Sequence, residues 1–433
     1  MDTDRFKNFE HDVRNLVLAF ERQQGADYRY FDVDQLEIIA DYYLEVYDVE
    51  GLEAAVKYGE QLFPLSSVIR LRRAHLLSMQ GMYQQALEIL KDLEHTEPDN
   101  TDVSYALGAV YSMLGKPRLA IDYYEKAAAD GYQLDMIYGN MADEYYRIDD
   151  KDSAISYYKK SIDQNPEEER SMFNLACAFN ELGRNIESEE YFTHVVTENP
   201  YSKSAWFTLG SVYSWLSLYE KAADAFEYAI AIDKTMFNAY LGLSDAYRFS
   251  GDLSRSVQAL RDAIPYADDK PYVVYCIGRI YLDAGNYHTA STYFHDAIKE
   301  DPSFALAWND LGRCSQSLGY VDEAAGYYRR AIDLDPDSDE HWVCLADLYM
   351  SSSRYAEACA LLESARTEAA DRFVFDSRLI YCYFRLGRRN RLFSLLQQDA
   401  SQYASLYHTL YNQYPDLSSD PEVVNNIAIL SAK

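Results

Sequence analysis

The chain has 433 residues, of which 48% are hydrophobic, so it is a folded protein long enough for more than one core. Its formal net charge of -30 at pH 7 argues against a nucleic-acid backbone or an anionic membrane as the main partner, because both bind through clustered Lys and Arg. A basic partner is compatible with this charge, and so is simple solubility.

Residues 1–32 contain the first predicted element, a helix with the sequence FKNFEHDVRNLVLAFERQ. From Val33 onward the sequence repeats every 34 residues, and ten rows from 33 to 372 align without an inserted or deleted residue. The eighth position of every row holds Gly, Ala or Ser, which chance very rarely produces. The sequence therefore predicts a repeat protein.

Each row is predicted to form two antiparallel helices. Positions 4, 7, 8 and 11 of a row share one helix face by the 3.6-residue period, and positions 20, 24 and 27 do so in a second helix. A Gly near position 15 supplies the turn, and Pro at position 32 ends the second helix. Gly210 and Gly312 stand at position 8, where Gly costs roughly 0.5–1 kcal/mol relative to Ala. We interpret them as making room for the large residue at position 24.

The end of the chain is predicted to complete this stack. An eleventh, degraded row runs from Phe373 to about Leu406, and residues 407–433 are expected to form one or two capping helices broken by YPDLSSDP. We expect the helix within residues 1–32 to cap the other end, because the end faces of a stack are otherwise bare apolar surface.

The pattern W-x-x-L-G-x-x-Y … A-x-x-x-F … P closely resembles the tetratricopeptide repeat. The stretches WFTLGSVY and YEKAADAFEYAIAID carry it, and the resemblance covers residues 33–372. It implies an all-α solenoid, a right-handed superhelix of helix pairs whose first helices line a concave groove. It also implies that the protein binds a peptide segment or a protein partner in that groove as a scaffold or adaptor.

The residues predicted to face the groove stand at positions 2, 5, 9, 12 and 13, about 135° from the packed face of the first helix. There, aromatic side chains offer contact area and a few Arg offer directed donors, although several of the aromatics could simply pack against the next repeat. We expect a partner on this wall between residues 135 and 338, at Asn140, Arg147, Arg170, Asn174, Trp215, Arg248, Tyr272, Arg279 and Arg313.

Three of these residues, Arg248, Arg279 and Arg313, could hold a carboxylate or phosphate of the partner. The alternative is a ladder in which they pair with Asp245 and Asp347 of the same chain. If they bind the partner, replacing Arg279 and Arg313 with Ala should weaken binding by at least about 2 kcal/mol and leave stability almost unchanged.

A second resemblance concerns Asn140, Asn174 and Arg170, which are similar to the residues by which some family members clamp a peptide carboxylate. The match is partial, because Tyr105 and Ala109 stand where the clamp would have Lys and Asn. This departure disfavours a clamp of that type.

Catalysis is not indicated by any motif. The sequence has no GxGxxG, GxxxxGK[ST], HExxH or GxSxG, and His288 and His295 lack a third metal ligand.

Six Cys without CxxC spacing and the lack of a signal peptide or a long apolar stretch favour a reducing cytoplasm and no membrane insertion. We therefore expect no enzyme, cofactor or metal. The alternatives to a scaffold are a regulatory subunit of a separately encoded enzyme and a self-associating structural protein.

Overall fold

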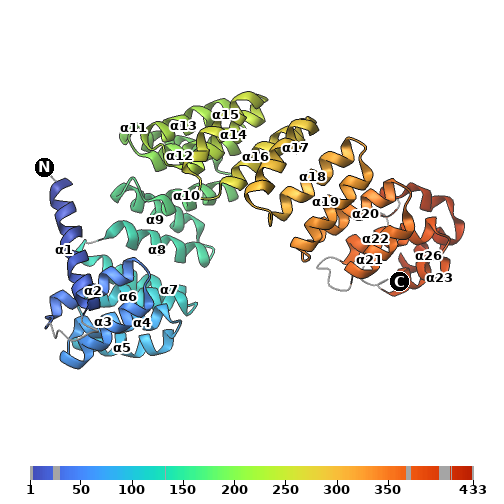
Figure 1. The fold of residues 1–433 in the computed structure, drawn as a ribbon. Coiled ribbons are helices and arrows are strands. Elements are labelled where there is room, and N and C mark those ends of the chain that lie inside the picture. Colours follow the sequence, from blue (N-terminus) through green and yellow to red (C-terminus); the bar gives the residue numbers. More distant parts are fainter. Residues whose placement is uncertain are drawn as a thin grey trace. The chain divides into compact units, whose positions relative to one another are not determined.

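The computed structural model describes residues 3–22, 30–131, 133–366, 372–398, 410 and 412–431 (Figure 1). The chain forms two compact units, residues 1–221 and 222–433. Throughout the described ranges the regular structure is helical and no strand occurs, which confirms the predicted all-α fold class.

The first unit is one helix followed by antiparallel helix pairs, each joined by a short turn. Its helices are α1 (Thr3–Arg22), α2 (Val33–Glu45), α3 (Val49–Leu62), α4 (Ser67–Met79), α5 (Tyr83–Thr96), α6 (Thr101–Met113), α7 (Pro117–Ala127), the 3₁₀ helix η2 (Ala128–Asp130), α8 (Leu134–Arg147), α9 (Lys151–Gln164), α10 (Glu169–Glu181), α11 (Asn185–Glu198) and α12 (Lys203–Trp215). The next helix, α13 (Tyr219–Ile232), contains the boundary between the units.

The second unit continues with the same kind of pair. Its helices are α14 (Phe237–Ser250), α15 (Leu253–Ala263), η3 (Ile264–Tyr266), α16 (Lys270–Asp283), α17 (Tyr287–Glu300), α18 (Ala305–Ser317), α19 (Val321–Leu334), α20 (Asp339–Ser351), α21 (Tyr355–Ala365), α22 (Arg372–Arg385), α23 (Arg389–Gln398), η5 (Pro415–Ser419) and α26 (Pro421–Ser431).

Small residues at position 8 bring the two helices of a pair together. A Cβ added to Gly312 would lie 2.7 Å from Cε1 of Tyr328, and one added to Gly278 would lie 2.6 Å from Cε1 of Phe294. Both aromatic rings stand at position 24 and are buried. The role predicted for Gly312 is thereby confirmed, since any side chain there would occupy the space of the Tyr328 ring. Gly210 is likewise buried, in α12.

The turn within each pair depends on one residue in the left-handed region of backbone conformation. Most pairs use glycine, with φ between 67° and 89° at position 15. Tyr47, Asp149, Ser217 and Ser353 occupy the same position with φ between 56° and 63°. These four turns carry backbone strain, because a left-handed conformation costs a residue with a Cβ about 1–2 kcal/mol.

Proline and tryptophan define the connection from one pair to the next. Six second helices end two residues before a proline, as α11 does before Pro200 and α17 before Pro302, because a residue preceding proline avoids the helical conformation. The indole N–H groups of Trp206, Trp308 and Trp342 each donate to the carbonyl of the proline six residues earlier, at 2.9–3.0 Å. This hydrogen bond fixes the start of each following first helix.

The end helices bury apolar residues against the outermost pairs. Val17 and Phe20 of α1 belong to the core that includes Leu36 of α2. Val423 and Ile427 of α26 belong to the last core of the second unit. The predicted boundary near residue 406 between the degraded row and the C-terminal cap falls in residues 399–409, outside the described residues.

We predict that Gly312→Leu costs at least about 1–3 kcal/mol in the free energy of unfolding, because the new side chain overlaps Tyr328. Gly326→Leu in the neighbouring helix α19 is the matched control, since a Cβ there meets nothing within 4 Å. Denaturant unfolding measures the cost. Hydrogen exchange should show the damage in α18, α19 and their neighbours, because repeats couple mainly to adjacent repeats. Equal effects of the two variants would contradict this account.

Tyr47→Gly is expected to stabilise the first unit by roughly 0.5–1 kcal/mol. The change relieves the left-handed strain at an exposed side chain, and this gain exceeds the added entropy of glycine in the unfolded chain. The reverse exchange, Gly81→Tyr, places a side chain in an equivalent turn and should destabilise. The midpoint temperature of thermal unfolding is measured for both variants. Shifts of the two midpoints in the same direction would contradict the strain argument.

Candidate functional site

The nine predicted groove residues all lie on first helices of their pairs, in two sets. Asn140, Arg147, Arg170, Asn174 and Trp215 belong to the first unit, on α8, α10 and α12. Arg248, Tyr272, Arg279 and Arg313 belong to the second unit, on α14, α16 and α18. Each set is described within its own unit.

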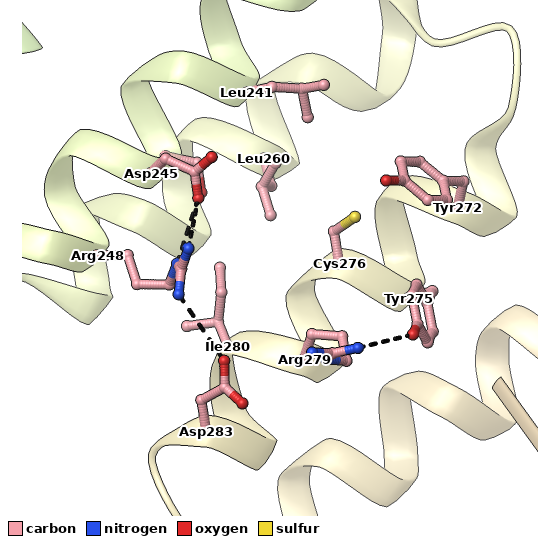
Figure 2. Close-up of a pocket in the computed structure, with 11 residues that line it drawn as sticks. Leu241, Asp245, Arg248, Leu260, Tyr272, Tyr275, Cys276, Arg279, Ile280 and Asp283 are labelled. Carbon is pink, nitrogen blue, oxygen red and sulfur yellow. Dashed lines mark hydrogen bonds and ion pairs between the residues drawn. The ribbon is translucent and has the colours of Figure 1, made fainter. Parts of the chain in front are cut away.

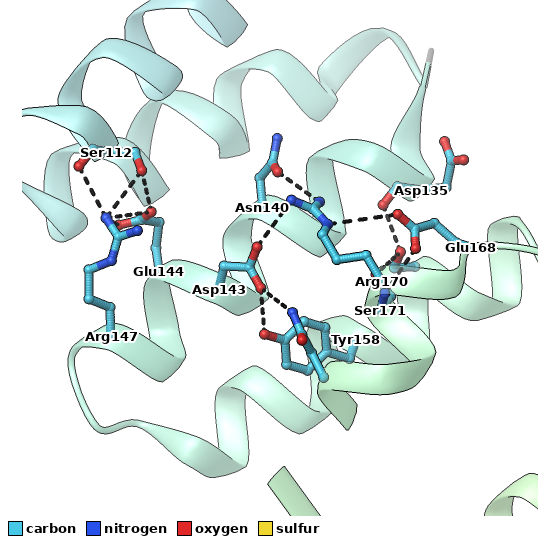
Figure 3. A network of polar contacts seen from close by, with 12 residues as sticks. Ser112, Asp135, Asn140, Asp143, Glu144, Arg147, Tyr158, Glu168, Arg170 and Ser171 are labelled. Atoms are coloured by element: carbon cyan, nitrogen blue, oxygen red, sulfur yellow. Dashed lines mark hydrogen bonds and ion pairs between the residues drawn. The ribbon is translucent and has the colours of Figure 1, made fainter. Parts of the chain in front are cut away.

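Asp143 is the centre of the first set (Figure 3). Its carboxylate accepts hydrogen bonds from the Tyr158 hydroxyl at 2.5 Å and from the Asn174 amide at 3.0 Å, and it pairs with Nη1 of Arg170 at 3.2 Å. Burial, followed by this hydrogen bond to Asp143, raises the pKa of the Tyr158 hydroxyl. Asp143 therefore joins α8 to both α9 and α10.

Asn140 extends this network to the preceding pair. Its Oδ1 accepts from Nη2 of Arg170 at 2.9 Å, and its Nδ2 donates to the Tyr105 hydroxyl at 3.1 Å. Arg147 makes a separate link, donating to the backbone carbonyl of Ser112 at 3.1 Å and pairing with the buried Glu144 at 3.2 Å. Through Asp143, Asn174 joins Asn140 and Arg170. Arg147 lies in its own cluster with Ser112 and Glu144 (Figure 3).

Aromatic side chains supply the exposed apolar surface of the first set. Phe173 is 55% exposed and Trp215 is 39% exposed. Beside Asp143 lies a hollow of about 430 Å³ whose lining includes Tyr146, Phe173 and Cys177. The hydrogen bond to Glu181 and partial burial raise the pKa of Tyr146 to about 12, so this hydroxyl stays protonated at neutral pH.

Asp310 is the centre of the second set. This carboxylate is only 2% exposed, and it accepts a hydrogen bond from the Tyr275 hydroxyl at 3.0 Å. Nη1 of Arg313 donates to it at 3.0 Å, and Nη1 of Arg279 lies 3.5 Å from it. Two guanidinium groups therefore share one buried carboxylate. Burial alone would lower the pKa of Arg279, but its hydrogen bond to Tyr275 and the charge of Asp310 outweigh burial and raise it.

Arg248 and Tyr272 lie on the rim of a neighbouring pocket of about 290 Å³ (Figure 2). Nη2 of Arg248 donates to Asp245 at 2.9 Å, and its Nη1 lies 3.9 Å from Asp283. Tyr272 is 41% exposed on the opposite side, next to Cys276. Burial raises the pKa of the Cys276 thiol, so it is a weak nucleophile at neutral pH.

One geometric rule connects these clusters. A polar residue at position 9 of one repeat bonds to a polar residue at position 6 of the next, 31 residues later. The pairs are Asp41 with Arg72, Asp143 with Asn174, Arg279 with Asp310, and Asp347 with Arg378. The carboxylate stands at position 9 in three pairs and at position 6 in the Arg279 pair.

The ladder considered from the sequence exists in part: Arg248 pairs with Asp245, but Arg279 and Arg313 pair with Asp310 instead. Asp245 accepts from Arg248, and Asp347 accepts from Arg378, so neither pairs with Arg279 or Arg313. Asp310 and Asp143 were not singled out from the sequence, although they hold the two clusters together. A signal existed for Asp310, because Asn and Asp interrupt the small residues common at position 6, whereas Asp143 stands at position 9.

The described residues contain no group of three or more His, Cys, Asp and Glu suited to a metal. His295 instead packs its ring against Tyr327. Within the same part of the chain, none of the helices combines the length and the apolar character needed to cross a bilayer.

One family model of the tetratricopeptide repeat matches this sequence at residues 71–133, 275–339 and 316–373. A second model of the same repeat matches residues 137–168 and 169–202. Together these ranges cover more than half of the chain. The chain belongs to the tetratricopeptide repeat family.

Among curated proteins, the chain is similar to the BBSome complex member BBS4 of Bos taurus, with 23% identity over 160 residues. The match covers 37% of this chain and 28% of BBS4, so it spans less than a third of that relative.

Similar solved structures were also found. The Cut9–Hcn1 hetero-tetramer of the APC/C has a TM-score of 0.36 and 13% identity, covering 98% of this chain and 94% of that one. PilF of Pseudomonas aeruginosa has a TM-score of 0.38 and 17% identity, covering 49% and 96%. A tetratricopeptide repeat protein of Parabacteroides merdae has a TM-score of 0.38 and 19% identity, covering 57% and 98%.

The double change of Arg279 and Arg313 to Ala is expected to destabilise the second unit by about 3 kcal/mol, because it leaves Asp310 buried without a cation. This replaces the expectation of unchanged stability, which did not include Asp310. Adding Asp310→Asn should restore most of the loss. Arg248→Ala is the control, since its exposed pairs contribute at most about 1 kcal/mol. Denaturant unfolding would contradict the account if Asp310→Asn gave no recovery.

Proposed function

We propose that this chain is a scaffold or adaptor that holds a peptide segment of a protein partner along the first helices of its repeat pairs. Tetratricopeptide repeat proteins are typically scaffolds that bind proteins, and the chain carries this family's pattern. We further propose that it performs no catalysis itself, and that it acts in the cytoplasm, where its six free cysteines would remain reduced.

The observation that carries the proposal is the presence, within each unit, of half-exposed aromatic side chains on first helices. Phe173, Trp215, Phe249 and Tyr272 are between 39% and 56% exposed. Aromatic anchors of this kind dominate binding energy where they become buried by a partner. Phe173 and Tyr272 stand beside polar groups that are already held in place by links between neighbouring repeats, so little side-chain entropy of those groups would be lost on binding.

The proposed binding surface comprises the nine predicted residues, as two sets within the two units. The organisation that we propose comprises ten repeats in 33–372, a degraded repeat in 373–406, and helical caps in 1–32 and 407–433. Arg147 and Arg170 already serve neighbouring acids, so we assign them mainly to holding the surface rather than to contacting the partner.

Site-specific photo-crosslinking in cells tests the proposal. A benzophenone amino acid replaces Phe173 of α10 in one variant and Ile186 of α11 in the control. Ile186 is 70% exposed and belongs to the second helix of the same pair, so simple accessibility favours the control. We expect the Phe173 variant to crosslink to one mapped segment of a partner and the Ile186 variant not to do so.

Equal crosslinking from the two positions would overturn binding on the first helices. The identity of the captured chain separates the alternatives. If the captured chain is a single enzyme in stoichiometric yield, this chain is a regulatory subunit. If the crosslinked peptides come from this chain itself, it self-associates. Light scattering over a concentration series provides an independent check of self-association.

A further inference from the structure

We infer that the pocket between α14 and α16 takes one apolar side chain of the bound peptide, and that Arg279 and Arg313 bind a carboxylate adjacent to it. This inference rests on the proposed function and gives the chemistry of the partner. The partner segment is thus an aliphatic or aromatic residue next to Asp or Glu.

The pocket lies at a junction that lacks the bond between position 9 and position 6 of neighbouring repeats. Asp245 stands at position 9, and the residue 31 positions later is Cys276, which is short and a poor hydrogen-bonding group. Within the described residues no hydrogen bond joins these two side chains, whereas Asn174 donates to Asp143 at 3.0 Å at the corresponding positions of the first unit. An opening of about 290 Å³ remains between the two helices (Figure 2).

The size and lining of this opening suit one side chain. Its volume lies just below the range of about 300–1,000 Å³ that is typical of small-molecule sites. Leu241, Leu260 and Ile280 make its apolar wall, and Tyr272 adds a half-exposed ring. Charged groups surround the apolar wall, and such a rim excludes water from an inserted side chain and strengthens its contribution.

The charge beside the pocket favours a carboxylate. Arg279 and Arg313 share Asp310, each through Nη1, so this cluster holds two positive charges and one negative charge. Their side chains are 44% and 42% exposed, which leaves the rest of each guanidinium open to a ligand. A partner carboxylate would accept from these open N–H groups, and Arg binds carboxylates through two parallel hydrogen bonds.

Asp245 and Asp283 are a weaker site for a basic group. Both already face Arg248, and their side chains are 61% and 49% exposed, so a partner Lys there would form a surface ion pair worth at most about 1 kcal/mol. The net charge of -30 does not prevent an acidic segment from binding, because charges beyond about 8 Å are screened at physiological ionic strength.

The test uses the full chain and a phage library of random 12-residue peptides. Enriched sequences are remade as amidated, fluorescein-labelled peptides, which removes the terminal carboxylate, and are measured by fluorescence anisotropy. We expect an apolar residue beside Asp or Glu in the enriched set. Cys276→Phe fills the pocket and should weaken binding at least about tenfold, whereas Cys276→Ser leaves it open and should change binding less than about twofold.

Arg279→Gln tests the carboxylate. We expect this substitution to weaken binding of the acidic peptide about tenfold, and to weaken binding of the Asp→Asn form of the same peptide less than about twofold. Arg354→Gln, which changes an arginine in the turn before α21, is the matched control and should leave both affinities unchanged. Circular dichroism establishes folding. If Cys276→Phe does not fold, Tyr272→Ala at the exposed rim replaces it, with the same expected loss.

Other outcomes overturn the inference. If basic peptides are enriched, Arg279 and Arg313 do not bind a carboxylate of the partner. If a phosphoserine peptide binds tenfold more tightly than its Asp form, the group bound by these arginines is a phosphate instead. Peptides insensitive to Cys276→Phe and Arg279→Gln bind elsewhere and would overturn the site while leaving the proposed function intact. If no peptide is enriched, the inference fails, and crosslinking at Phe173 still decides the proposed function separately.

Discussion

The close approach of the two helices within a pair is the constraint on which the rest of the structure depends. At Gly312 the backbone lies so close to Tyr328 that no side chain fits between them. The same arrangement recurs at Gly278 with Phe294 and at Gly108 with Tyr124. Because dispersion contacts fall off steeply with distance, a wider spacing would lose the burial of a whole aromatic ring in each pair.

Once the pairs are packed in this way, the outward faces of the first helices are left to make contacts between repeats. At four junctions, a bond between position 9 and position 6 of the next repeat fixes those faces. They use side chains of different charge at different places, so the backbone geometry rather than the residue type is repeated. A surface held by such bonds offers a partner side chains that are already oriented, which is the property that the proposed binding function requires.

The period made the helix pairs, their turns and the close glycine contacts predictable from the sequence. Gly312 could be assigned because both the small residue and its large partner recur at fixed positions. The polar clusters could not be assigned in the same way. Whether Arg279 reaches Asp245 or Asp310 depends on the direction in which its long side chain leaves the helix, and the repeat period contains no information about that. Asp310 also stands among apolar positions, where a charged residue is stable only because two arginines and a tyrosine surround it.

The hydrogen bond from tryptophan to proline has a consequence for spectroscopy. Three of the four tryptophans, Trp206, Trp308 and Trp342, make this bond to a backbone carbonyl in equivalent connections between pairs. Their emission therefore reports on the integrity of those connections rather than on the groove. Trp215 stands outside this group, at the end of α12 on the proposed binding face. A chain in which the other three are replaced by Phe would keep Trp215 as its one tryptophan. The emission wavelength of that chain would then report the solvent exposure of the proposed binding face alone.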